Sequence, residues 1–216
     1  MKQATEPFQF VTASYLVRIC PERARTVGDL LRGVTSCSDA SIFYHTFQSL
    51  EAHHYTTFSS DFAQWAMSAC NDALLAERLV GVDFRDFVSI DDLRKELVQR
   101  LDEHIQQQPP AASRSAFEAF YFCEAVEKTV SRDEQATTLG ELAEGIRRIG
   151  LQTLHHHFIN SRLRLKLQTN DFSHWIRMNL ALPHLADALN RIDIYTNTLE
   201  NIRSEVLETI EPWINR

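Results

Sequence analysis

Two histidines and two aspartates are the residues of this chain whose types and spacing best suit chemistry. Asp61 follows His45, and Asp171 follows His157, so the same pair of residue types occurs twice. An imidazole beside a carboxylate can act as a general base, ligate a metal or form a hydrogen-bonded structural pair. We treat both pairs as candidate site residues and expect a structural role, in which each histidine donates to a neighbouring carboxylate or helix end.

A metal site would need ligand spacings that the other histidines do not supply. His155, His156 and His157 are consecutive, and on a helix such side chains point about 100° apart, so they cannot all bind one ion. His53 and His54 are likewise adjacent, and the chain has no His-Glu-x-x-His motif. We expect no bound metal and no other cofactor.

A tryptophan follows each aspartate by four residues, as Trp65 and Trp175. An aspartate at a helix N-cap accepts a backbone hydrogen bond, and a tryptophan one turn later can point into the core. We therefore expect Asp61 and Asp171 to cap two helices and both tryptophans to be core residues. The alternative is a surface binding site at the same positions.

One basic run, Arg162–Leu167, alternates charged and apolar residues. It would lie at the C-terminal end of a helix, where cations are favourable, or along one side of a strand. We expect a solvated face. The alternative is contact of Arg162 and Arg164 with an anion or an acidic partner.

Composition and motif content argue against several classes of protein. The 29 acidic residues exceed the 22 basic residues, and the net charge of −7 disfavours nucleic-acid binding. The chain lacks an apolar run that could span a bilayer, a signal segment, a Gly-x-Ser-x-Gly motif and a glycine-rich phosphate loop. Its four cysteines form no Cys-x-x-Cys pair. We expect a cytoplasmic protein that binds neither nucleic acid nor membrane, and we favour a non-catalytic role over an enzymatic one.

The elements that position the candidate residues are repeated along the chain. Three blocks match in order at spacings of 112, 110 and 109 residues: Thr26–Leu30 with Thr138–Leu142, Asp61–Trp65 with Asp171–Trp175, and Ser89–Asp91 with Thr198–Glu200. His45 and His157 share the first spacing. The order of the blocks indicates a tandem duplication of a module of roughly 100 residues. The first change of spacing predicts a loop before Asp61.

A proline-containing segment separates the two copies. Pro109 and Pro110 end any helix that reaches them. We expect residues 1–105 to form the first helical module, residues 106–115 a Gln/Pro linker and residues 116–216 the second helical module.

Within each copy the pattern is typical of short helices, which predicts a mainly α fold with the two modules about a pseudo-twofold axis. Helix N-caps with an acidic residue three positions later are predicted at Thr26, Thr138 and Ser89. Apolar residues at helical spacing follow in three segments: Phe43, Phe47 and Leu50; Leu93, Leu97 and Leu101; and Ile202, Val206 and Ile210. The aromatic segments Phe8–Val11 and Phe120–Cys123 are short enough to be strands at the start of each module.

Several motifs together resemble a bacterial family of domains of unknown function. They are Ser41–Thr46, Asp61-Phe62 with Trp65, Asn170–Ser173 with Trp175, and Asp193 with Tyr195-Thr196 and Thr198–Glu200. The resemblance covers nearly the whole length, and it implies no activity, substrate or cofactor.

The absence of catalytic motifs and the duplication favour a non-catalytic protein-interaction module with a scaffold or regulatory role. Such a module binds a protein partner or associates with itself. The alternative is an enzyme or small-ligand-binding protein with a pocket between the copies near His45 and His157. The two hypotheses differ in whether these histidines converge on a cavity or point into separate cores.

Overall fold

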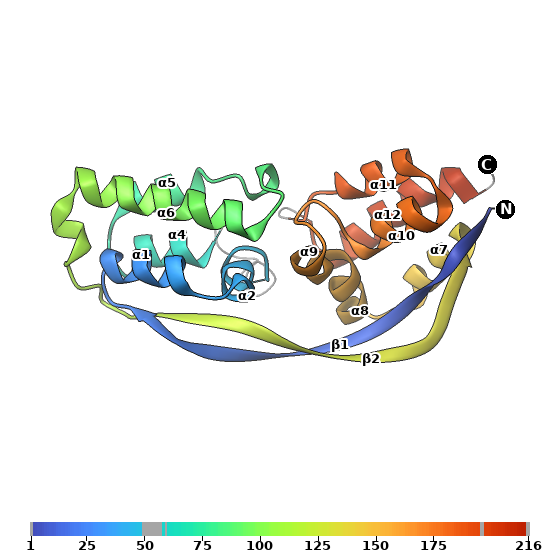
Figure 1. Ribbon diagram of the computed structural model, residues 1–216, viewed down its shortest axis with the longest axis horizontal. Coiled ribbons are helices and arrows are strands. Elements are labelled where there is room, and N and C mark those ends of the chain that lie inside the picture. The colour runs from blue at the N-terminus through green and yellow to red at the C-terminus, as the bar shows by residue number, and fades with distance from the viewer. Residues whose placement is uncertain (1, 49–57, 59, 195–196, 215–216) are drawn as a thin grey trace. The chain divides into compact units, whose positions relative to one another are not determined.

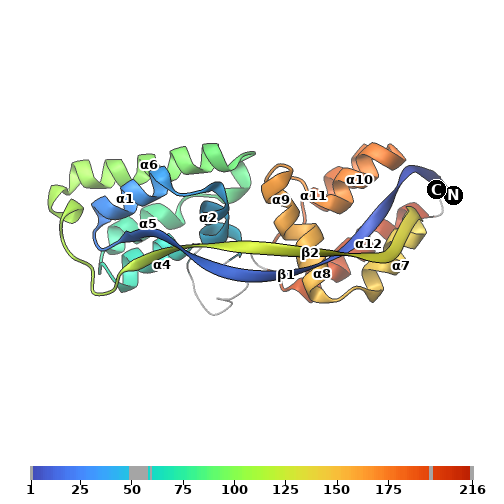
Figure 2. The same cartoon turned by 60° about the horizontal axis from the view of Figure 1, so that its bottom comes forward.

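The computed structural model describes residues 2–48, 58, 60–194 and 197–214. Two long strands, β1 (Gln3–Ala24) and β2 (Phe120–Thr138), form a two-stranded sheet. They run side by side in both views of the molecule (Figures 1 and 2).

The two strands are antiparallel. The Gln9 side chain donates to the backbone carbonyl of Glu134, and the Ser14 hydroxyl to that of Lys128. Residue numbers therefore rise along one strand as they fall along the other.

The fold is mixed α/β, so the prediction of a mainly α fold built from duplicated helical modules is wrong. The aromatic segments Phe8–Val11 and Phe120–Cys123 do form strands, but they belong to strands of 22 and 19 residues. β-branched residues such as Val17, Ile19 and Val130 favour the extended backbone beyond them. All three are exposed, so the strands lack the alternation of buried and exposed residues that would have identified them.

The chain divides into two compact units. The amino-terminal unit is Leu16–Val126, and the carboxy-terminal unit combines Met1–Tyr15 with Glu127–Arg216. The division crosses both strands, so each unit contains a part of β1 and a part of β2. Residues 3–15 of β1 thus lie with helices that are more than a hundred residues away in the sequence.

Each unit contains a series of helices. In the amino-terminal unit they are α1 (Val27–Ser36), α2 (Asp39–Phe43), the π-helix η1 (Tyr44–Gln48), α4 (Asp61–Ser68), α5 (Ala73–Val80), the 3-10 helix η2 (Phe84–Asp86), α6 (Ile90–Gln107) and the 3-10 helix η3 (Pro109–Ala112). In the carboxy-terminal unit they are α7 (Leu139–Arg148), α8 (Leu151–His155), the π-helix η4 (His156–Asn160), α9 (Ser161–Arg164), α10 (Asp171–Leu180), α11 (Pro183–Asn190) and α12 (Leu199–Ile214). Within the described residues, α1, α2, η1, α4, α5 and α6 of the amino-terminal unit occur in the same order as α7, α8, η4, α10, α11 and α12 of the carboxy-terminal unit, whereas η2, η3 and α9 have no counterpart.

Helix caps confirm part of the sequence analysis and correct another part. Thr26 and Thr138 form capping boxes at α1 and α7, and Ser89 caps α6. The expectation that Asp61 and Asp171 are N-caps is wrong by one residue. Ser60 accepts from Ala63 N–H at the start of α4, and Asn170 accepts from Ser173 N–H at the start of α10. Since these polar residues occupy the caps, both aspartates are left to bind other groups.

The expected apolar stripes of the last helices are confirmed: Leu93, Leu97, Leu101, Ile202, Val206 and Ile210 are all buried. Phe43 and Phe47 stack at 5.0 Å between ring centroids, whereas Leu50 and the loop expected before Asp61 fall largely on residues outside the described ranges. None of the helices in the described ranges has the length and apolar character that crossing a bilayer requires.

The proline segment packs against the amino-terminal unit. Helix α6 runs on to Gln107, and Ala111 in η3 is buried. A Cβ atom added at Gly28 in α1 would lie 2.6 Å from the carbonyl oxygen of Ala112, so the close approach of η3 requires glycine there. The segment 106–115 is therefore a packed element of this unit between α6 and β2.

Candidate functional site

An aromatic groove in the amino-terminal unit receives the start of β2. The rings of Phe120 and Phe122 are buried. Phe120 lies 4.7 Å from the ring of His45, 5.3 Å from that of Phe62 and 6.0 Å from that of Trp65, between ring centroids. Side chains from helix α4 and the π-helix η1 thus line the groove, and the start of β2 fills it.

His45 links helix α4 to the strand by two hydrogen bonds. Its Nδ1 lies 2.8 Å from Asp61 Oδ2, and its Nε2 accepts from the backbone N–H of Cys123 at 2.8 Å. Because Nε2 accepts, the proton of the neutral ring is on Nδ1, where it is donated to the carboxylate. We call this arrangement of aspartate, histidine and strand N–H a histidine clamp.

Trp65 provides a second connection in the same groove. Its indole Nε1–H donates to the backbone carbonyl of Glu118 at 2.9 Å. The indole itself is buried beside Phe120. A buried indole N–H needs an acceptor, and here that acceptor is the backbone just before β2.

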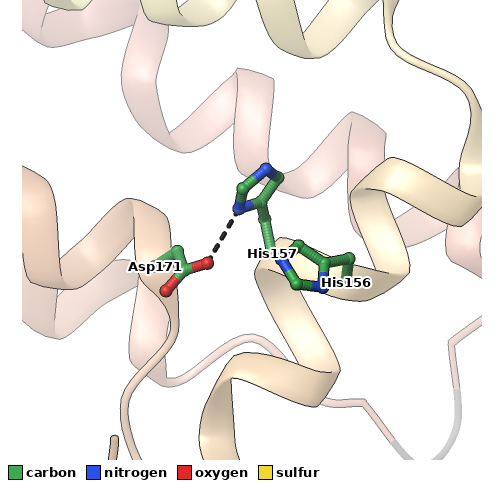
Figure 3. A group of neighbouring side chains, drawn as sticks. All are labelled: His156, His157 and Asp171. Atoms are coloured by element: carbon green, nitrogen blue, oxygen red, sulfur yellow. Dashed lines mark hydrogen bonds and ion pairs between the residues drawn. The ribbon is translucent and has the colours of Figure 1, made fainter. Parts of the chain in front are cut away.

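The carboxy-terminal unit contains the same clamp with the start of β1. His157 Nδ1 lies 2.7 Å from Asp171 Oδ2, and Nε2 accepts from Val11 N–H at 3.0 Å. Trp175 Nε1–H donates to the carbonyl of Glu6 at 2.8 Å. Figure 3 shows His157 pointing toward Asp171, with His156 beside it on the same turn.

The π-helices place the clamp histidines. His45 is the second residue of η1, and His157 is the second residue of η4. A π-turn carries one more residue than an α-turn and so redirects the side chains that it presents. Both histidines are buried.

Further ionisable side chains surround the clamp of the carboxy-terminal unit. Arg164 donates to both carboxylate oxygens of Asp171, at 2.8 and 2.6 Å. His156 forms an ion pair with Glu127 through Nδ1, and Arg164 lies 3.5 Å from its Nε2. The Tyr15 hydroxyl lies 3.2 Å from Glu127 Oε1. The carboxylates of Glu127 and Asp171 thus have partners on β1, η4 and α9.

These contacts shift several protonation equilibria. Burial lowers the pKa of His157, and the hydrogen bond to Asp171 offsets this in part. Burial acts to raise the pKa of Asp171, but the hydrogen bonds from His157 and Arg164 outweigh it, so that pKa lies below its usual value. The pKa of Glu127 is also lowered, because its bonds to His156 and Tyr15 outweigh the effect of burial. A neutral His157 beside an ionised Asp171 is therefore the stable state.

His156, His157 and Asp171 are the group that comes closest to a metal site in the described part of the chain, with one ligand atom of each within 4.8 Å of the others. Two observations oppose a metal there. Both ring nitrogens of His157 already have partners, and its Nε2 is bound to the strand. The guanidinium of Arg164 occupies both oxygens of Asp171, and a second cation would have to displace it.

The two arginines of the basic run have different environments. Arg162 is buried and donates to the backbone carbonyls of Phe158 and Leu167, so the expectation of a solvated face is wrong for this residue. Arg164 is about half exposed, and its guanidinium is paired with Asp171. His53, His54, Tyr195 and Thr196, which the sequence analysis singled out, lie outside the described residues.

The structure brings His45, Asp61 and Trp65 together in one unit, and His157, Asp171, Trp175 and Arg164 in the other. Each histidine points into the core of its own unit. The strand residues that complete the grooves were not among the predicted site residues. A signal was present, because Glu6-x-Phe8-x-Phe10 recurs as Glu118-x-Phe120-x-Phe122 at the spacing of the two histidines.

Comparison with known proteins gives a family and a fold. A model of DUF5752, a family of unknown function, matches residues 5–211. The solved structure of OrfY from Thermoproteus tenax is similar to this chain, with 30% identity and a TM-score of 0.85. The match covers 99% of this chain and 98% of that one. A search of curated proteins gave no match.

Proposed function

The chain belongs to DUF5752, a family of unknown function, and we propose from its geometry that it is a non-catalytic protein-interaction module. A protein partner covers an apolar surface on the strands of the amino-terminal unit. We call the exposed apolar side chains of this region, which lie on both faces of the sheet, the strand patch and define it as Leu16, Val17, Ile19 and Val126.

The exposure of the strand patch carries the proposal. Leu16 is 75% exposed, Val17 56% and Ile19 65%, and Val126 on the other strand is 44% exposed. Neighbouring side chains of a strand point to opposite faces of the sheet. Because Leu16 and Val17 are both exposed, neither face is covered at this point of β1. Both strands are edges of a two-stranded sheet. Apolar residues beside free strand edges suit a partner that adds an extended segment of its own.

The candidate catalytic residues support a non-catalytic role. A general base needs a free lone pair, and a nucleophile-activating histidine needs a free nitrogen aimed at substrate. In both clamps one histidine nitrogen is bound to a carboxylate and the other to a strand N–H. An enzyme with a pocket lined by His45 and His157 would require these bonds to break.

The proposal is tested with the double variant Leu16→Lys and Ile19→Lys, which places two charges on the patch. Met178→Lys is the matched control, since Met178 is 63% exposed on α10 of the other unit. Proteins from the native host that are retained by the parent and by the control, but not by the patch variant, are purified and titrated against all three chains.

We expect at least one purified partner to bind the parent and the control alike and the patch variant at least about 10-fold more weakly. Partners that bind all three chains equally would overturn the proposal. Turnover of a substrate that is lost in His45→Asn or His157→Asn, with folding intact, would favour the enzyme alternative.

A further inference from the structure

We infer that the aromatic groove of the carboxy-terminal unit accepts residues 6–11 from a second copy of this chain as well as from its own, so that two copies form a strand-exchanged dimer. The inference concerns the grooves and is independent of the strand patch. It begins with the way in which each groove is filled.

Each set of helices is completed by the aromatic strand segment that precedes the other set. Helices 27–107 hold residues 118–123 of β2, whereas helices 139–214 hold residues 6–11 of β1. Within one chain the two copies of the module have therefore exchanged equivalent segments. This is the arrangement that a domain-swapped dimer has between two chains.

The two grooves recognise their segments by the same contacts. The indole N–H binds the carbonyl of the glutamate, two phenylalanines are buried at alternate positions, and the histidine binds the N–H of the next residue. A glycine in the first helix faces the second phenylalanine in each case. A Cβ at Gly33 would lie 2.3 Å from the Phe122 ring, and a Cβ at Gly145 would lie 2.2 Å from the Phe10 ring.

These contacts recognise a backbone carbonyl, two phenylalanines at alternate positions and a backbone N–H, and they do not depend on which chain carries these groups. Two of the four involve the segment's backbone alone. A second copy that presents residues 6–11 makes every one of these contacts. Exchange between chains therefore keeps all of these contacts, and its cost is the entropy of association together with the pairing of β1 with β2 that has to open where the strands pass from one unit to the other.

Complementation between two full-length variants tests the inference. The segment variant, Phe8→Ser with Phe10→Ser, has an open groove and a defective segment. The groove variant, Gly145→Val, keeps the segment but blocks its groove at the Phe10 position. Each is a monomer alone, and the mixture is expected to form a one-to-one dimer by sedimentation velocity.

The control is the chain that carries all three substitutions, which is expected to form no dimer with the segment variant. A labelled peptide of residues 3–13 gives a second measurement, and we expect it to bind the segment variant about 100-fold more tightly than the same peptide with serine at positions 8 and 10. Monomers in the mixture together with equal binding of both peptides would overturn the inference.

A third measurement does not depend on the folding of the variants. Donor-labelled and acceptor-labelled parent chains are mixed, warmed close to their melting temperature and cooled. We expect energy transfer between the labels, with a dimer fraction that grows with protein concentration. The energy transfer should be weaker when both labelled chains carry Gly145→Val. A parent chain that remains monomeric under these conditions would also contradict the inference.

Discussion

The two units hold their strands by the same clamp but surround it with different groups. In the amino-terminal unit the residue before His45 is Tyr44, a phenol whose pKa is raised chiefly by burial. In the carboxy-terminal unit the residue before His157 is His156, which joins Glu127 and Arg164 in a network. The difference separates two properties. The clamp geometry holds the strand in both units, whereas the neighbours determine how the clamp of each unit responds to charge and pH.

The largest loss of stability that we expect tests how each groove holds its strand, which is common to both units. Trp65→Ala and Trp175→Ala should each lower the free energy of unfolding by about 3–5 kcal/mol, because each removes a buried indole and its bond to the strand backbone. Denaturant unfolding measures the loss. Replacement by phenylalanine, which keeps most of the packing, should cost less. If either alanine variant unfolds like the parent, that indole belongs to a surface site and the two grooves are not equivalent.

A smaller effect tests the network of the carboxy-terminal unit. Asp171→Asn should lower the free energy of unfolding by about 1.5–3 kcal/mol, because it weakens the charge-assisted bonds from Arg164 and His157. Arg164→Met should cost less, since its side chain is about half exposed. Asp61→Asn gives the corresponding value for the other clamp. Additive effects of the first two substitutions in a double-mutant cycle would show that Asp171 and Arg164 are not coupled.

The pH dependence of the carboxy-terminal clamp should be smaller again. The folded-state pKa of His157 is lowered by burial from the ordinary 6.5, so the unfolded chain takes up the proton first. Stability from this group is therefore complete above pH 6.5 and decreases as the pH falls toward the folded-state pKa, by at most about 1.4 kcal/mol per pH unit. Asp171, whose pKa is lowered from 3.8, keeps its contribution until the pH falls below that value.

Amide hydrogen exchange, corrected for the intrinsic effect of pH, can follow this change at the Val11 N–H, which binds His157 Nε2. We expect protection of Val11 to fall between pH 7.5 and pH 5.5. Exchange of the Cys123 N–H, which is bound to His45, gives the corresponding measurement in the other unit. Unchanged protection at Val11 over this range would contradict the expected coupling between protonation of His157 and the stability of its bond to the strand.

The smallest expected effect is that of zinc. Because Arg164 and the strand N–H occupy the groups that a metal would need, added zinc should leave the melting temperature unchanged, and elemental analysis should find no stoichiometric transition metal. If one zinc per chain were found and were lost in His156→Ala or His157→Ala, these residues would form a metal site and the prediction would be wrong.

The repeat predicted which residues recur, but it did not predict where each one binds. The capping boxes at Thr26 and Thr138 were recognised because both of their members lie within four residues. The role of Asp61 was assigned to the helix end, since local spacing cannot distinguish the first helical residue from the cap before it. Its actual partner, His45, lies sixteen residues away. Contacts at such distances are set by tertiary packing.

The strands were underestimated for a related reason. A strand with one buried face alternates apolar and polar residues, but much of the middle of β1 is exposed on both faces and shows no such pattern. The exchange of segments between the modules was not predictable from local patterns, because Glu6 and Glu118 mark equivalent segments without indicating which helices hold them. Long-range contacts such as that of Trp175 with Glu6 and that of His157 with Val11 resolve this.

The exchanged segments also determine the order in which the chain can complete its folding during synthesis. The bond from Trp65 to Glu118 spans 53 residues, so the amino-terminal unit can close soon after β2 begins to emerge. The bond from Trp175 to Glu6 spans 169 residues. Phe8 and Phe10 are made early and find their groove only after α10 has been made, so they stay uncovered for most of translation. Residues 6–11 are thus the last to be placed, and during that interval they are available to chaperones and to neighbouring nascent chains.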